Sequence, residues 1–105
     1  MSYKLVCDAY TETPEYSMLG FSVHADAGTI DGGAKMEFVP DQCIDTSSGN
    51  PLLEHGIAVG KNGVVIIPTT YLGTMQFCVQ FSDGLRTANV TGYNPGQEYT
   101  LVDIE

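Results

Sequence analysis

The sequence predicts an all-β fold, a small antiparallel β-sandwich of seven or eight short strands, in a single domain over residues 1–105. In several segments apolar residues alternate with polar ones, which is the period of a strand. No segment longer than about ten residues carries apolar residues at the spacing of three and four that a helix needs. Glycine, proline, Asn-Gly and Asp-Gly steps interrupt the alternation at intervals typical of sandwiches and barrels.

The first predicted strands span residues 3–10 and 17–25, separated by a turn over residues 11–15 that contains a proline. Residues 26–33 hold three glycines and two aspartates and predict a loop. Residues 34–39 predict a third strand, which the following proline ends. The residues that share one side of the first two strands are Tyr3, Leu5, Cys7 and Ala9, then Leu19, Phe21, Val23 and Ala25.

The middle of the chain is less regular. Residues 45–51 contain no apolar residue except a final proline, and residues 42–51 predict the loop best suited to be mobile. Residues 52–59 are compatible with a helical turn after Pro51 or with a strand from about Ile57. Asn62-Gly63 predicts a hairpin with a type I′ turn.

The second half continues the strand pattern. Residues 64–67 are wholly apolar and predict a buried strand that ends at a proline. Residues 74–81 alternate strictly, an Asp-Gly turn follows, and residues 85–90 predict the return strand. A turn at residues 94–96 precedes the last predicted strand, residues 99–104.

The chain has three cysteines, Cys7, Cys43 and Cys78, and an odd number excludes a disulfide framework in which every cysteine is paired. None lies at a zinc-ligand spacing from another. Cys78 stands in an apolar stretch, which predicts a small core residue. A single Cys7–Cys78 disulfide stays open, because the sequence does not show whether the two strands are neighbours.

The order of turns in the second half resembles that of immunoglobulin-like sandwiches. It is most similar to transthyretin-like or carboxypeptidase-regulatory-like modules, and Pro95-Gly96-x-x-Tyr99 resembles the tyrosine corner of fibronectin type III domains. The resemblance implies an accessory, adhesive or structural module, including those that decorate bacteriophage capsids and tails. The segments that carry it are residues 60–68, 71–74, 77–84, 88–91 and 94–101.

The charge is strongly one-sided: 13 Asp and Glu residues face 4 Lys and Arg residues, for a net charge of −9. So few cations exclude nucleic acid as a partner and disfavour an anionic membrane surface. The N-terminal residues show no signal-peptide pattern, and the longest purely apolar run is residues 64–67, so we expect no transmembrane segment. The expected location is the cytoplasm or a virion.

The chemistry-bearing residues form no recognisable catalytic motif. A Ser-His-Asp or Cys-His site would depend on His24 or His55, the latter with Cys43 as nucleophile. A metal site would need His24 and Asp26 with a third ligand such as Asp31 or Asp8; an oxygen-rich calcium site would draw on Asp26, Asp31, Asp41 and Asp45. We therefore predict no catalytic residue, no metal and no cofactor.

Exposed tyrosines beside acidic residues suit a protein interaction surface. The predicted interaction residues are Tyr10, Tyr16, Tyr71, Tyr93, Glu12 and Glu15. The function expected from these observations is a non-enzymatic structural or protein-interaction module, from a bacteriophage particle, that binds a protein partner or forms a homo-oligomer.

Two other functions stay open. The first is a small acidic inhibitor of a host enzyme or defence complex, including one that mimics DNA. Clustering of the acids on one side of the fold would favour it, namely of Glu12, Glu15, Asp26, Asp31 and Glu37. The second is a hydrolase or metal enzyme, which requires a histidine in a pocket with two carboxylates.

Overall fold

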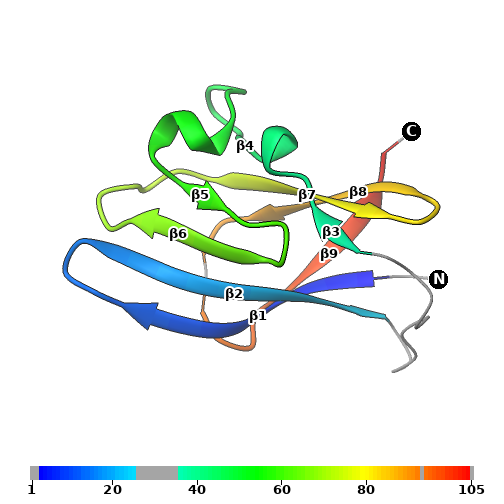
Figure 1. Ribbon diagram of the computed structural model, residues 1–105, viewed down its shortest axis with the longest axis horizontal. Coiled ribbons are helices and arrows are strands. Elements are labelled where there is room, and N and C mark those ends of the chain that lie inside the picture. Colours follow the sequence, from blue (N-terminus) through cyan, green and yellow to red (C-terminus); the bar gives the residue numbers. More distant parts are fainter. Residues whose placement is uncertain (1–2, 26–35, 93, 105) are drawn as a thin grey trace.

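The computed structural model describes residues 3–25, 36–92 and 94–104, and these residues contain no α-helix. They form nine strands and two short 3-10 helices (Figure 1). The predicted all-β class is confirmed. The strands are β1 (Tyr3–Glu12), β2 (Tyr16–Ala25), β3 (Glu37–Phe38), β4 (Ile44–Asp45), β5 (Ala58–Val59), β6 (Val64–Pro68), β7 (Met75–Phe81), β8 (Gly84–Val90) and β9 (Glu98–Asp103), and the 3-10 helices are η2 (Pro40–Gln42) and η3 (Leu52–His55).

All strand pairs are antiparallel, and they follow one path in the order β3-β7-β8-β9-β1-β2-β6-β5, with β4 also on β7. Strand β9 makes the path continuous, because Leu101 pairs with β1 while Val102 and Asp103 pair with β8. The sheet therefore curls until it is nearly a barrel, and it is not clearly the predicted sandwich of seven or eight strands.

The core lies inside this curled sheet and is built from the alternating positions of the strands. Phe77 of β7 is fully buried, and its ring centroid lies 5.2 Å from that of Phe21 and 5.9 Å from that of Phe38. Burying a side chain of this size stabilises the fold by about 2 to 3 kcal/mol. The predicted inward faces of residues 17–25 and 74–81 are confirmed, and Cys78 is a buried core residue as expected.

Strand β1 departs from its predicted alternation at Asp8. The register with β2 shifts between Cys7 and Ala9, which marks a β-bulge. Because a bulge inserts one extra residue, every later side chain changes face. Ala9 is exposed rather than inward, and Tyr10 packs against the core instead.

The β5–β6 hairpin differs from the predicted type I′ turn. Gly60 donates to the carbonyl oxygen of Val64 over 2.8 Å and accepts from the amide of Gly63 over 3.0 Å, so three residues lie in the loop. Gly63 has φ +88°, as expected of a type I turn closed by a glycine bulge. Tertiary contact explains the choice: the Gly63 carbonyl accepts from the Phe21 amide over 2.9 Å, and a Cβ on Gly63 would overlap the Phe21 carbonyl oxygen.

Residues 52–59 form both of the predicted structures, first a helical turn and then a strand. The 3-10 helix η3 follows Pro51, Gly56 ends it with φ +80°, and β5 begins at Ala58. The third strand is confined to Glu37 and Phe38 within the described residues. The predicted loop 26–33 and the first residues of that strand lie outside them.

Candidate functional site

The predicted interaction residues do not form one surface. Glu12, Glu15 and Tyr16 are exposed at the β1–β2 hairpin, whereas Tyr10 faces the core side of the same hairpin and is half-buried. Tyr93 lies outside the described residues. The structure thus places Tyr16 with the two glutamates at the hairpin and Tyr10 on its other face.

Tyr10 and Tyr71 do come together, on the wall of a shallow hollow of about 350 Å³ that also includes the exposed Leu72. Their hydroxyls have partners inside the molecule. Tyr10 Oη lies 3.3 Å from Ser17 Oγ, and Tyr71 Oη donates to Asp45 Oδ2 over 2.6 Å. These tyrosines line the hollow, and their hydroxyls form hydrogen bonds within the fold.

Asp45 organises the stretch that the sequence predicts as a loop. Its Oδ1 accepts from the amides and hydroxyls of Ser47 and Ser48, over 3.0 to 3.2 Å, while Oδ2 accepts from Tyr71. The Tyr71 hydrogen bond, followed by that of the Ser48 amide, holds the pKa of Asp45 well below its usual range. The turn is closed around an ionised carboxylate whose surface is almost fully covered.

This network contains a serine and a histidine, but the serine lies between the carboxylate and the histidine, whereas in a catalytic triad the histidine lies between the other two. Ser48 Oγ donates to Asp45 and accepts from the Asn50 amide, and His55 Nε2 lies 3.2 Å away. A serine nucleophile must give its proton to the histidine. Ser48 has one hydroxyl proton for both Asp45 and His55, so the hydrogen bond to Asp45, which supports the turn, competes with the bond to His55 that attack would need.

A second constellation lies on the outward side of β1 and β2. Ser22 Oγ is 2.8 Å from His24 Nε2 and also donates to Asp8, whose Oδ1 is 3.8 Å from the same histidine nitrogen. The structure therefore brings Asp8 to His24, as the metal hypothesis requires, whereas Asp26 and Asp31 lie outside the described residues. Within the described ranges no group of three or more His, Cys, Asp or Glu residues is arranged to hold a metal.

The cysteines are free thiols in the core. Cys43 Sγ lies 3.4 Å from the amide nitrogen of Cys78, and burial raises the pKa of Cys43 to about 11. A nucleophilic cysteine needs a lowered pKa, so this environment opposes the Cys43–His55 hypothesis. The Cys7–Cys78 disulfide is not formed; in the strand order β8, β9 and β1 follow β7, so β1 and β7 are not neighbours.

A further surface emerges only from the register of β1, β2, β6 and β5. Cross-strand partners on the side away from the core share one face of a sheet. We call the hairpin end of this side, from Ala9 and Gly20 to Tyr16 and Pro68, the outer face; beyond it the same side of β1 and β2 carries Lys4, Asp8 and His24. Its residues are Ala9, Gly20 and Val64 in one row, Thr11, Met18, Ile66 and Ala58 in the next, and Tyr16 and Pro68 in the third.

The outer face carries no charged side chain, although the chain has a net charge of −9. Its larger members remain open to solvent: Met18 is 46% exposed, Tyr16 44% and Val64 38%. Of these, only Tyr16 is among the interaction residues predicted from the sequence. One feature of the sequence pointed to this surface: residues 64–67 are apolar on both sides of their strand, which indicates that both faces of the strand are covered.

No helix among the described residues is long and apolar enough to cross a membrane. The chain matches no protein-family model, no curated protein and no solved structure with which it was compared.

Proposed function

We propose that the protein is a non-enzymatic structural or protein-interaction module that associates with further copies of itself through the outer face. The observation that carries this proposal is the absence of charge from the outer face of an acidic chain. Copies that meet through another surface bring negatively charged carboxylates together and repel each other. Copies that meet through the outer face bury apolar surface and no charge.

The size of the outer face supports a weak contact. The outer face spans five residues on each of β2 and β6, three on β1 and two on β5. At about 4.8 Å between strands and 3.4 Å along them for each residue, it covers about 250 Å². A stable protein complex buries about 800 Å² on each partner. A single contact of this size is therefore transient, and it becomes strong only where many copies are held together, as in a particle. Such a particle, a bacteriophage capsid or tail, is proposed from the resemblance alone.

The affiliation with immunoglobulin-like or transthyretin-like sandwiches is likewise proposed from the order of turns. One detail opposes the fibronectin-type variant. In a tyrosine corner the tyrosine hydroxyl bonds to the backbone, but Tyr99 Oη is buried and has no hydrogen-bond partner among the described residues.

The acidic inhibitor gains no support from the described acids. Glu12 and Glu15 lie at the β1–β2 hairpin, and Glu37 begins β3, which lies away from that hairpin toward the other end of the long axis (Figure 1). Asp26 and Asp31 lie outside the described residues. We therefore propose assembly rather than inhibition.

The test is the dependence of association on concentration and salt, measured by sedimentation velocity. We expect the average mass to rise with concentration and to rise further in high salt, because salt screens the repulsion between acidic copies. Met18→Glu should abolish this rise. Val102→Glu is the matched control, since Val102 is 58% exposed but lies on β9, outside the outer face. A mass that stays monomeric in high salt, or an equal effect of both variants, would overturn the proposal.

A further inference from the structure

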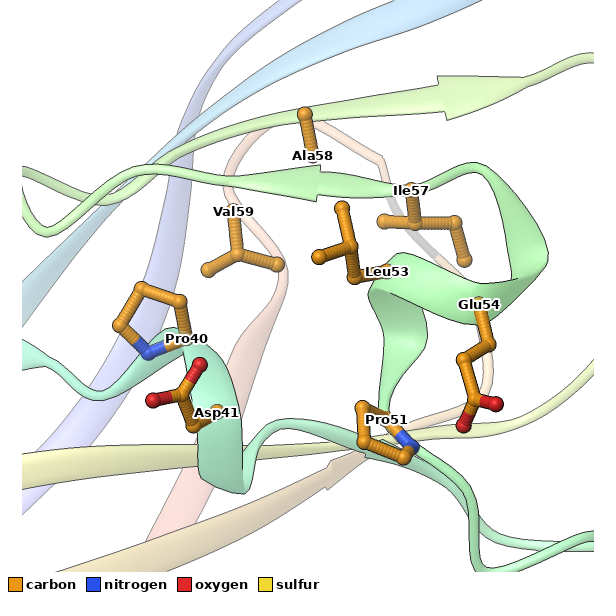
Figure 2. A pocket seen from close by; sticks show the side chains of 8 residues that line it. All are labelled: Pro40, Asp41, Pro51, Leu53, Glu54, Ile57, Ala58 and Val59. Atoms are coloured by element: carbon orange, nitrogen blue, oxygen red, sulfur yellow. The ribbon is translucent and has the colours of Figure 1, made fainter.

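The curled sheet leaves an open seam between its two ends. Strand β5 ends the path on one side, β3 and β4 lie at the other end, and the 3-10 helices η2 and η3 lie between them. The seam contains a hollow of about 470 Å³, which we call the seam groove (Figure 2). Its lining residues are Pro40, Asp41, Pro51, Leu53, Glu54, Ile57, Ala58 and Val59.

The walls of the seam groove are mostly apolar. Ile57 is fully buried, whereas Leu53 is 72% exposed although it lines the hollow. Figure 2 shows the side chains of Leu53, Val59 and Pro40 around a common space. An apolar hollow with an open leucine on its wall suits one apolar side chain of a ligand.

The charge at the seam groove has one sign. Asp41 on η2 and Glu54 on η3 stand on opposite sides of the hollow (Figure 2), and no lysine or arginine lines it. Neither carboxylate forms an ion pair with any described residue. A ligand that crosses the hollow thus meets a carboxylate on each side, and cationic groups complement both.

The backbone of β5 offers a third element of recognition. The Gly60 amide donates to the Val64 carbonyl oxygen, and in an antiparallel pair the bonding residues alternate. Ala58 therefore bonds toward β6, while the N–H and C=O of Val59 point away from β6, along the free edge. An extended chain can add to such an edge by main-chain hydrogen bonds.

We propose that the seam groove binds an extended basic segment of a partner protein. One apolar side chain of the segment enters the hollow, flanking lysines or arginines pair with Asp41 and Glu54, and its backbone bonds to Val59. This binding goes beyond the self-association proposed above, and the two surfaces share only Ala58.

The partner is a different protein, because this chain has no basic segment to offer. Its four cations are Lys4, Lys35, Lys61 and Arg86, each separated from the next by many residues. Two of them are engaged: Lys4 lies 3.1 Å from Glu98, and Arg86 lies 2.9 Å from Asp83.

The experiment measures binding of a short fluorescent peptide by anisotropy. The peptide has a central leucine between valines and carries lysine and arginine toward its ends. We expect saturable binding that weakens with salt, and a loss of about fivefold in the Asp41→Asn, Glu54→Gln double variant, as two exposed ion pairs predict. Leu53→Asn should also weaken binding, because it makes one wall of the hollow polar.

The matched control is the Glu12→Gln, Glu15→Gln double variant, which removes the same charge from the β1–β2 hairpin. It should bind the peptide as the unmodified protein does. Equal losses in the two double variants would show attraction by net charge alone, and unchanged affinity when the peptide's leucine is replaced by glycine would show that the hollow is unused. Either result, or no binding at all, overturns the proposal.

Discussion

The hydroxyl of Tyr71 donates a 2.6 Å hydrogen bond to Asp45, 26 positions away in the chain. Gly73 makes this contact feasible, since a Cβ there would lie against both Tyr71 Oη and Asp45 Oδ2. The contact ties the segment before β7 to the turn that follows β4. A residue selected from the sequence for interaction thus has a structural role as well.

Tyr71→Phe should lower the urea midpoint of unfolding at neutral pH. Tyr71 is the largest cause of the lowered pKa of Asp45. A carboxyl with a lowered folded pKa stabilises the fold above its ordinary value of about 3.9, and that contribution is lost as the pH falls toward the folded value. The difference between the variant and the unmodified protein should therefore be constant from pH 7 to 5 and shrink below about pH 4.

Circular dichroism in urea at several pH values measures this difference. Tyr16→Phe is the control, since Tyr16 is exposed and its hydroxyl has no partner among the described residues. A Tyr71→Phe deficit that is the same at every pH would contradict the role of the ionised Asp45.

Gly63→Ala should destabilise the protein more than Gly49→Ala. Both glycines have positive φ, +88° and +73°, so both variants bear a conformational cost of about 1 to 2 kcal/mol. Only at Gly63 would the new Cβ overlap the Phe21 carbonyl oxygen, whereas nothing lies near that of Gly49. We expect a total of about 3 kcal/mol at Gly63 in thermal or urea unfolding, and equal losses would show that β2 does not determine the hairpin.

Arg86→Lys should cost about 1 to 2 kcal/mol although the charge is kept. The guanidinium lies 4.8 Å and 4.4 Å from the ring centroids of Tyr3 and Phe81 and bonds both Asp83 and Asp103. The lysine ammonium lacks both the diverging N–H donors that reach the two carboxylates and the planar group that stacks on the two rings. Lys61→Arg, at an exposed position, should leave the urea midpoint unchanged; an unchanged midpoint for Arg86→Lys as well would refute the argument.

Tyr99→Phe should leave stability unchanged or raise it by up to about 1 kcal/mol, because a buried hydroxyl without a partner is a cost. Burial also raises the pKa of this tyrosine. The tyrosine-corner resemblance predicts the opposite, a loss of stability on removing the hydroxyl. Thermal unfolding of Tyr99→Phe therefore decides between the two.

The three thiols should react with a thiol reagent at pH 8 only as fast as the protein opens. Burial raises the pKa of Cys7, Cys43 and Cys78, and only the thiolate reacts. The reaction, followed by absorbance, should accelerate in urea. Rapid labelling of any thiol in the native protein would contradict its buried position.

The period of two determined much of this fold from sequence. Residues 17–25 and 74–81 have one apolar side, and burying that side leaves little freedom in the orientation of each strand. The turn residues likewise placed the ends of most strands. For residues 52–59 the sequence left a helical turn and a strand as alternatives, and the structure contains both, one after the other, at Leu52–His55 and Ala58–Val59.

Only the tertiary structure decided the features that carry the proposals. The bulge at Asp8 and the turn closed by Gly63 depend on the backbone of the neighbouring strand β2, which local propensity does not encode. The outer face and the seam groove arise from residues distant in the chain, and their positions follow from strand register and incomplete closure. Sequence determined which side chains most strands bury, because that choice is local, except where the bulge reversed β1 after Cys7. Pairing between strands determined which surfaces remain for a partner.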